Sequence, residues 1–354
     1  MLFYFGSYFQ RFFGPARLFQ SYTVLIALAL YSSFFVTLKL LPLFYNILPH
    51  DRGREYALTA EAAKGKPTGA GAVFITIYAL ICILFVPMGL VQAGILLLTW
   101  LTMLTGFLDD YSAVSWGEYR KGALDLLVSA AGAVVLYYRA KGEGATASVW
   151  LPFVTHPVSL SAAVYIAISV ILLWASINTT NCTDGIDGLS GTLVLVALLT
   201  LGFIFYFILG HKDIAAYLLV PHIAEGAKWA LMAFALSGVL MGYLWHNAFP
   251  SSVLMGDAGS RALGFAIGAG VLACGNPIMI FATSFIIFVN GGVGLLKLAL
   301  LRFFHIKIFK NIRFPLHDHM RKNCGWSETQ VLLKFLIVQM LITTALVGLF
   351  FKVR

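Results

Sequence analysis

The side chains most able to do chemistry are carboxylates and amides that stand in short polar segments. One segment reads NTTNCTDGIDG, and in it Asn178, Asn181, Asp184 and Asp187 recur at every third residue. Residues at this spacing share one face of a helical or turn-like path, and Gly185 leaves room for a ligand to approach the backbone. A helix cap needs only one such residue, so four at regular spacing indicate a ligand-binding site.

Two other segments supply carboxylates. Asp109 and Asp110 are adjacent at the end of an apolar stretch, where their repulsion must be compensated by a cation or a hydrogen-bond donor. Asp257 stands between glycines in the string MGDAGS, which ends at Ser260. Taken alone, the aspartate pair also fits solvated residues that end a helix, and MGDAGS fits a simple turn. Together with the first segment, they predict an acidic site.

Carboxylate and amide oxygens favour Mg²⁺, which proteins bind through one or two carboxylates plus substrate phosphates. Lys64, Lys66 and Lys121 add the positive charge that a diphosphate needs. These residue types therefore predict Mg²⁺-assisted phosphoryl transfer.

The string FPLHDH adds His317 and His319. With Cys324 they could form part of a zinc site, but no fourth ligand is apparent. The cysteines of the chain are scattered and form no CxxC pair. We therefore predict that the two histidines contact phosphate or substrate.

The elements that position these residues must lie in a membrane. The chain is 60% hydrophobic and 11% charged, with a mean hydropathy of +0.88, whereas soluble domains are about 45–50% apolar and about 25% charged. This composition excludes a soluble enzyme, a secreted disulfide scaffold and a nucleic-acid-binding domain. The net charge of +9 then indicates topology and contact with anionic membrane lipid, and no nucleic-acid partner is expected.

Ten apolar stretches approach the roughly 20 residues that a transmembrane helix needs. They predict an all-α, polytopic membrane protein with one domain, residues 1–354. The third and eighth stretches are short, and the ninth contains Gly291-Gly292-Val293-Gly294, which predicts a kinked or broken helix. The aromatic segment 1–20 is predicted to lie at the membrane interface. The predicted spans are 22–45, 69–91, 93–108, 123–138, 161–177, 189–209, 228–245, 262–274, 278–301 and 329–351.

The odd-numbered loops carry 13 of the 24 Lys and Arg residues, against 8 on the opposite face with both termini. The positive-inside rule therefore places these loops in the cytosol and both termini outside. Acidic residues contribute little to orientation, yet most of them also stand in these loops, which indicates a site there. The loops are 46–68, 109–122, 178–188, 246–261 and 302–328, and their acids are Asp51, Glu55, Glu61, Asp109, Asp110, Glu118, Asp184, Asp187, Asp257, Asp318 and Glu328.

The strings NTTNCTDGIDGL, MGDAGS and FPLHDH, on ten spans, resemble the polyprenyl-phosphate N-acetylhexosamine-1-phosphate transferases. The histidine string followed by GWSE favours the members that use UDP-MurNAc-pentapeptide over those that use UDP-GlcNAc for teichoic acid or O-antigen synthesis. The resemblance implies that phospho-MurNAc-pentapeptide is transferred to undecaprenyl phosphate at the bacterial plasma membrane. The products would be lipid I, for peptidoglycan synthesis, and UMP. It also implies a homodimer.

The resemblance also assigns roles to residues. Asp257 would bind Mg²⁺, and Asp109 or Asp110 would deprotonate the lipid phosphate. Asp184 would lie beside the diphosphate, and Asp187 with Gly185 would contact uridine. His317 would be a catalytic residue. The other positions that match the family's substrate cleft are Lys64, Thr68, Lys121, Asn178, Asn181, Asn247, Ser260 and His319.

The chain departs from the family pattern at several positions. Ala113 replaces a lysine, Leu254 replaces an aromatic residue, and Asp318 replaces the middle histidine of a triple. Lys297 stands where the family has an uncharged polar residue, and it would restore the missing cation if the glycine kink turns it into the cleft.

A transporter is the alternative of another class. It is disfavoured because proton and ion pathways place acidic residues near the bilayer midplane. Asp125 is the only carboxylate inside a predicted span, and it lies near the end of that span.

Overall fold

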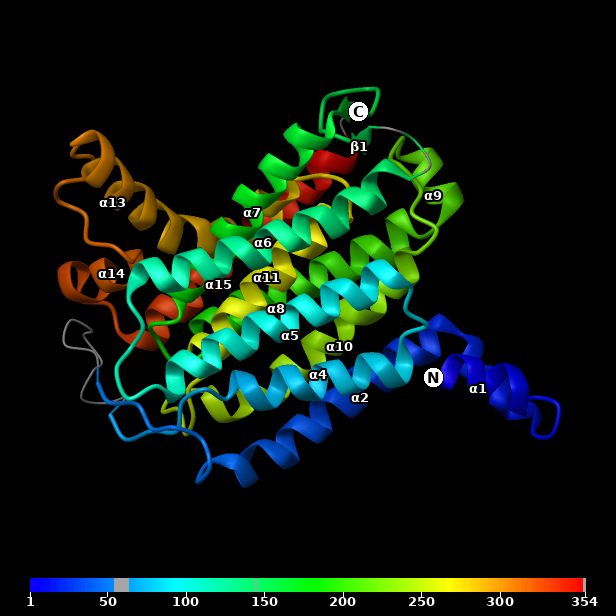
Figure 1. The fold of residues 1–354 in the computed structure, drawn as a ribbon, viewed down its shortest axis with the longest axis horizontal. Helices are drawn as coiled ribbons and strands as arrows, with labels where there is room; N and C mark the ends of the chain where they lie inside the picture. Colours follow the sequence, from blue (N-terminus) through cyan, green and yellow to red (C-terminus); the bar gives the residue numbers. More distant parts are fainter. Residues whose placement is uncertain (54–63, 143, 145, 353–354) are drawn as a thin grey trace.

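Long apolar helices make up most of the computed structural model, which describes residues 1–53, 64–142, 144 and 146–352. In this part of the chain, eight helical segments are long and apolar enough to cross a membrane, so the predicted all-α, multi-pass architecture is confirmed. Figure 1 shows them side by side in one bundle. They are α2 (Tyr22–Leu40) with η2 (Leu41–Phe44), α5 (Leu90–Tyr111), α6 (Glu118–Lys141), α7 (Ala162–Thr183), α8 (Leu189–Phe203) with η3 (Ile204–Leu209), α10 (Gly226–Asn247), α12 (Met279–Ile287) with η4 (Phe288–Gly292) and α13 (Val293–Phe304), and α15 (Glu328–Lys352).

The other two predicted spans are the shorter helices α4 (Gly71–Phe85) and α11 (Gly256–Ala273). The prediction that the third span is short is wrong, because α5 has 22 residues and the second span, α4, has 15. Pro87 explains the difference. It favours an extended conformation at the preceding residue, Val86, which adopts φ −85° and ψ 124° and ends α4.

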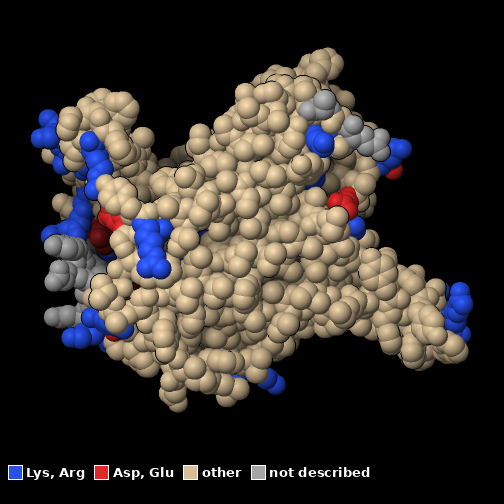
Figure 2. All heavy atoms as spheres, in the orientation of Figure 1, with Lys and Arg blue, Asp and Glu red and all other residues tan. Residues whose placement is uncertain are grey.

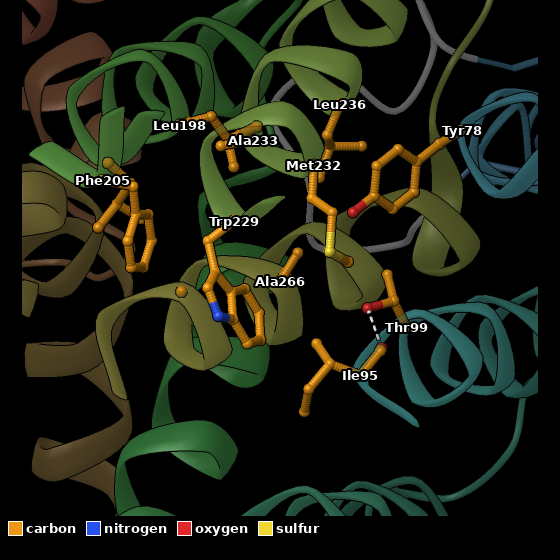
Figure 3. Close-up of a pocket in the computed structure, with 12 residues that line it drawn as sticks. Tyr78, Ile95, Thr99, Leu198, Phe205, Trp229, Met232, Ala233, Leu236 and Ala266 are labelled. Carbon is orange, nitrogen blue, oxygen red and sulfur yellow. Dashed lines mark hydrogen bonds between the residues drawn. The ribbon is translucent and has the colours of Figure 1, made fainter. Parts of the chain in front are cut away.

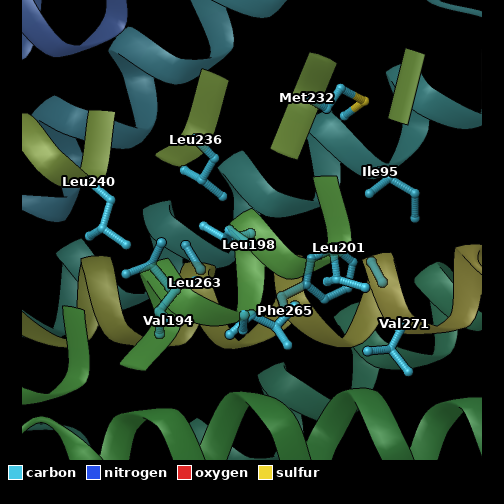
Figure 4. Packing of buried hydrophobic residues seen from close by; sticks show 14 of the residues in the cluster. Ile95, Val194, Leu198, Leu201, Met232, Leu236, Leu240, Leu263, Phe265 and Val271 are labelled. Atoms are coloured by element: carbon cyan, nitrogen blue, oxygen red, sulfur yellow. The ribbon is translucent and has the colours of Figure 1, made fainter. Parts of the chain in front are cut away.

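The helix α11 lies in the centre of the bundle. Apart from two charged residues near its start it is apolar or small on every side, and a helix of this kind is stable only when it is surrounded by protein. Figure 4 shows Leu263, Phe265 and Val271 of α11 packed among Val194 and Leu198 of α8 and leucines of α10. The residues at the start of α11 are thereby held in a fixed position.

The ninth predicted span bends, as its glycines predicted. Ser284 in α12 has non-helical dihedral angles, φ −138° and ψ 27°, and the π-helical η4 follows. Beyond it, α13 projects away from the bundle in Figure 1, and Gly294 is its buried residue.

Smaller elements connect the long helices. An antiparallel hairpin of β1 (Ala147–Val149) and β2 (Val158–Leu160) joins α6 to α7, and no strand was predicted there. The aromatic segment at the start forms α1 (Leu2–Phe9) and η1 (Gly14–Gln20), which pack on each other. The remaining helices are α9 (Lys212–Tyr217) and α14 (Leu316–Cys324).

The two ends of the bundle differ in charge. Lys and Arg side chains gather at the end that carries α13 and α14, with acidic atoms set back between them (Figure 2). The start of α1 and the end of α15 lie at the other end (Figure 1). Residues 54–63 of the predicted loop 46–68, including Glu55 and Glu61, lie outside the described residues.

Candidate active site

An ammonium group held between two carboxylates forms the centre of the site. Lys121 of α6 forms an ion pair with Asp109 of α5, and its Nζ lies 2.9 Å from Oδ2 of Asp257 of α11. The second oxygen of Asp109 accepts a hydrogen bond from the backbone N–H of Trp116 at 2.6 Å. Asp109 and Asp257 are only 5% and 4% exposed, and charges this buried must be paired. Three predicted residues on three helices therefore meet at one point.

Asp110 has a different set of contacts. Its two carboxylate oxygens accept the backbone N–H groups of Asp257 and Ala258, each at 3.0 Å, at the start of α11. A helix N-terminus attracts negative charge because its first N–H groups have no partner within the helix. Gly256 makes this contact possible: its φ is +68°, and a Cβ there would lie 2.3 Å from Oδ2 of Asp110. The contacts of Asp110 position Asp257.

The segment that contains Asn178 and Asn181 is helical rather than a loop. It forms the last turns of α7, which ends at Thr183, and Asp184 stands at its C-terminal cap. Asp109 and Asp110 likewise belong to the last turn of α5. The predicted spans end with the apolar stretch, at the edge of the hydrocarbon layer. A helix can continue beyond that edge as long as its backbone hydrogen bonds are made.

Asp187 lies in the turn that follows α7. Its side chain connects this turn to the segment after α10. Its Oδ2 accepts the backbone N–H of Ser251 at 2.9 Å and lies 3.6 Å from the Lys66 ammonium. The same ammonium donates to the Ser251 hydroxyl at 3.0 Å. Lys66 therefore ties the Asp187 turn to a second loop.

Two residues predicted to bind substrate point into the protein. Asn247 is 3% exposed, and its side chain accepts the N–H of Gly188 and donates to the carbonyl of Val253. Ser260 is 1% exposed and donates to the carbonyl of Gly256 within α11. These contacts hold the loops of the site together.

His317 is buried beneath the Asp187 turn. Its backbone N–H and its Nδ1 both lie within hydrogen-bond distance of the Asn290 side-chain oxygen, at 2.8 and 3.1 Å. A Cβ on Gly185 would lie 2.4 Å from Nε2 of His317, so the histidine packs directly against that glycine. Burial, together with the nearby Arg321 charge, lowers the pKa of His317 to about 4. The ring is neutral at physiological pH.

The other residues of α14 lie nearer the surface. Nδ1 of His319 accepts the backbone N–H of Arg313 at 3.3 Å. Asp318 lies 3.7 Å from the Arg313 guanidinium, and burial raises its pKa above the usual range although that cation opposes the shift.

Lys64 and Thr68 lie on the segment that leads into α4. Lys64 is exposed and borders an open hollow of about 690 Å³ at the charged end of the bundle, together with Arg52 and Tyr111. Thr68 is 9% exposed, and its backbone N–H donates to the carbonyl of Pro49. The hollow is a surface on which a charged substrate could rest.

Two of the departures from the family pattern have structural outcomes. Lys297 donates to the carbonyls of Phe309 and Ile312, each at 2.9 Å, and therefore caps the loop after α13. The bend does not turn Lys297 into the cleft, because it carries α13 away from the bundle. Arg52 instead donates to the carbonyl of Ala113, so a cation reaches the place where the family's lysine is missing.

Asp125 and Arg261 form a buried ion pair that was not predicted. A signal was present in the sequence, since each stands four residues after a site residue of opposite charge, Lys121 and Asp257. Residues four apart in a helix lie on one face.

The central carboxylates suit a divalent cation. Among the described residues no three His, Cys, Asp or Glu side chains form a cluster that could hold a metal. Asp109 and Asp257, however, reach one point, which is now occupied by the Lys121 ammonium. Mg²⁺ commonly binds through one or two carboxylates and takes its other ligands from water and substrate phosphates. The donor set fits that mode.

An internal cavity elsewhere does not contribute to this site. It measures about 30 Å³ and is lined mainly by apolar side chains, among them Ile95, Leu198, Trp229 and Met232 (Figure 3). This volume has room for about one water molecule, which excludes a nucleotide or a sugar.

Comparison with known proteins shows the family of this chain. The family model for glycosyl transferase family 4 matches residues 92–275. The phospho-N-acetylmuramoyl-pentapeptide-transferase of Treponema pallidum is 56% identical over 98% of this chain and 95% of its own length. That of Campylobacter jejuni is 31% identical over 81% of this chain and 82% of its own. That of Nautilia profundicola is 29% identical over the full length of both chains.

Proposed function

Since the chain belongs to glycosyl transferase family 4 and groups there with the phospho-N-acetylmuramoyl-pentapeptide-transferases, we propose that its charged end carries out their reaction. It transfers phospho-MurNAc-pentapeptide from UDP-MurNAc-pentapeptide to undecaprenyl phosphate, giving lipid I and UMP for peptidoglycan synthesis. The observation that carries the assignment of the site is the Lys121 ammonium between two buried carboxylates.

In the reaction, an oxygen of the lipid phosphate attacks the β-phosphorus of the nucleotide. The bond from that phosphorus to the oxygen shared with the α-phosphate breaks, and UMP leaves with that oxygen. A phosphate monoester has a second pKa of about 6, so the lipid phosphate is largely dianionic at neutral pH and needs no strong base. Positioning and charge neutralisation then account for most of the rate.

The contacts of Asp109 and Asp110 differ, and we propose different roles for them. Both oxygens of Asp110 accept backbone N–H groups of α11, which supports a positioning role. Asp109 faces Lys121 and Asp257, which supports a role beside the reacting phosphates. Mg²⁺ bound by Asp109 and Asp257 would neutralise charge on the diphosphate, and Lys121 adds a further positive charge.

The Asp187 turn is the place we assign to uridine, with Gly185 beside it. Lys66 and the backbone of Ser251 hold this turn, and Asn178, Asn181 and Asp184 stand just before it, in the last turns of α7 and at its C-terminal cap. We assign Lys64, Thr68 and His319 to the approach of the diphosphate and the pentapeptide from the cytosol.

The charge distribution supports an orientation. Lys and Arg gather at the end that contains the site (Figure 2), and cytosolic ends of membrane proteins carry such an excess. We place this end in the cytosol at the bacterial plasma membrane, with both termini outside. The resemblance to the family also favours a homodimer, which the mass of the purified protein in detergent would test.

Release of UMP by purified protein in detergent tests the function. With undecaprenyl phosphate we expect UMP from UDP-MurNAc-pentapeptide and none from UDP-GlcNAc, and we expect EDTA to abolish release until Mg²⁺ is restored. Activity with UDP-GlcNAc alone would refute the assignment of substrate. A sugar phosphate trapped on the protein without lipid would refute direct attack.

A further inference from the structure

Two ion pairs of opposite polarity join α6 to α11. In the first, Lys121 of α6 faces Asp257 of α11. In the second, Asp125 of α6 faces Arg261 of α11, and both Nε and Nη2 of the arginine donate to the same carboxylate oxygen. On each helix the two residues are four apart, so the second pair lies about one turn below the first.

The deeper pair is shut off from water. Asp125 is 2% exposed and Arg261 is 1% exposed, whereas the side chain of Lys121 is 27% exposed. The deeper pair is therefore out of reach of a substrate that enters from the cytosol. A buried ion pair also adds little net stability, because the loss of hydration offsets the attraction, and its best-attested use is to fix the register of packed elements.

A third helix of the site meets the same carboxylate. Asp125 lies beside the side-chain amide of Asn178 of α7. The helices α7 and α11 themselves approach closely, since a Cβ on Gly264 would lie 2.4 Å from the carbonyl oxygen of Ser176. Asp125 of α6 thus contacts residues of both α7 and α11. These three helices carry Lys121 (α6), Asn178 (α7) and Asp257 (α11).

We propose that Asp125 and Arg261 are a positioning pair, which holds α6 against α11 in the register that places the Lys121 ammonium between Asp109 and Asp257. The proposal rests on the proposed function, because it assigns these three residues to the reacting site. The pair acts through them and touches neither substrate nor metal.

The test replaces both charges at once. Loss of a single partner would leave an unpaired buried charge and could prevent folding, so Asp125→Leu is combined with Arg261→Met. A misplacement of about 1 Å costs roughly 10²-fold in rate. We expect kcat for UMP release to fall by about that factor, with KM for the UDP-sugar and the unfolding temperature unchanged. Arg261→Lys alone keeps the charge opposite Asp125 and should retain most of the wild-type kcat.

A second measurement does not depend on turnover. Mn²⁺ titrated into the substrate-free protein and followed by electron paramagnetic resonance reports the arrangement of Asp109 and Asp257, and we expect the double variant to bind about tenfold more weakly. The matched control is Glu225→Gln with Lys228→Gln, which removes an ion pair at the other end of the bundle. It should change neither kcat nor Mn²⁺ affinity.

The outcomes separate the two proposals. Unchanged kcat and unchanged Mn²⁺ affinity in the double variant would overturn the positioning role, and so would a fall in kcat that only follows loss of folded protein. Wild-type protein inactive on both UDP-sugars would refute the proposed function. Weaker Mn²⁺ binding by the double variant would then still support the positioning role.

Discussion

At the scale of single residues, Lys121 has the contacts most specific to the site. Its ammonium is the cation that pairs with Asp109 and Asp257. We expect Lys121→Gln to lower kcat by roughly 10²–10³-fold, because such a fall is typical when a group that stabilises developing charge is removed. UMP release measures it. Lys352→Gln, at the other end of the chain, is the control, and equal activities of the two variants would contradict the role of Lys121.

His317 predicts a dependence of stability on pH. Its pKa of about 4 in the folded protein lies below the unfolded value of 6.5, so the unfolded chain binds the proton first as pH falls. The contribution is fully present above pH 6.5 and is lost as pH falls toward 4, by on the order of 3 kcal/mol. His317→Gln should lack this loss. Unfolding by SDS in detergent at pH 7 and pH 4 checks it, and parallel losses in both proteins would contradict it.

At the scale of elements, Gly256 decides whether α5 and α11 can meet. Its φ is positive, and a Cβ on this residue would lie only 2.3 Å from Oδ2 of Asp110, which leaves no room for a side chain. We expect Gly256→Ala to cost about 1–3 kcal/mol of stability and to lower UMP release with it. Gly348→Ala in α15 is the matched control, since nothing lies within 4 Å of its Cβ position. A Gly256→Ala protein as stable and active as wild type would contradict this account.

The elements themselves were largely predictable, and their ends were not. Each predicted span coincides with a helical segment, because apolar length measures the hydrocarbon thickness. The predicted spans end before Asp109 and Asn178, whereas the helices continue through them, because the same measure cannot detect a helix that continues into polar surroundings. The break in the ninth span was predictable from its glycines, but the direction of α13, and hence the position of Lys297, depends on packing.

Within the site, sequence patterns predicted which residues gather but not which way they face. Asn247 and Asp187 have similar polar character, yet the first is buried in loop contacts and the second holds the turn proposed for uridine. The direction in which a side chain points is set by tertiary contacts between distant segments, such as the contact of Asp110 with α11. The ion pair of Asp125 and Arg261 was missed because Asp125 was assigned to a membrane span and Arg261 to a loop, although their side chains meet.

At the scale of the whole molecule, the proposed orientation can be tested with cysteines. Cys324 is exposed on α14 at the charged end, whereas Cys82 and Cys274 are buried. In protein carrying Cys182→Ala, we expect a membrane-impermeant maleimide to label Cys324 in inverted vesicles and not in intact cells, because the positive end faces the cytosol. With Cys324→Ala added, Ser7→Cys in α1 is exposed at the opposite end and should label in intact cells. The reverse pattern would place the active site outside, where cytosolic UDP-sugars cannot reach it.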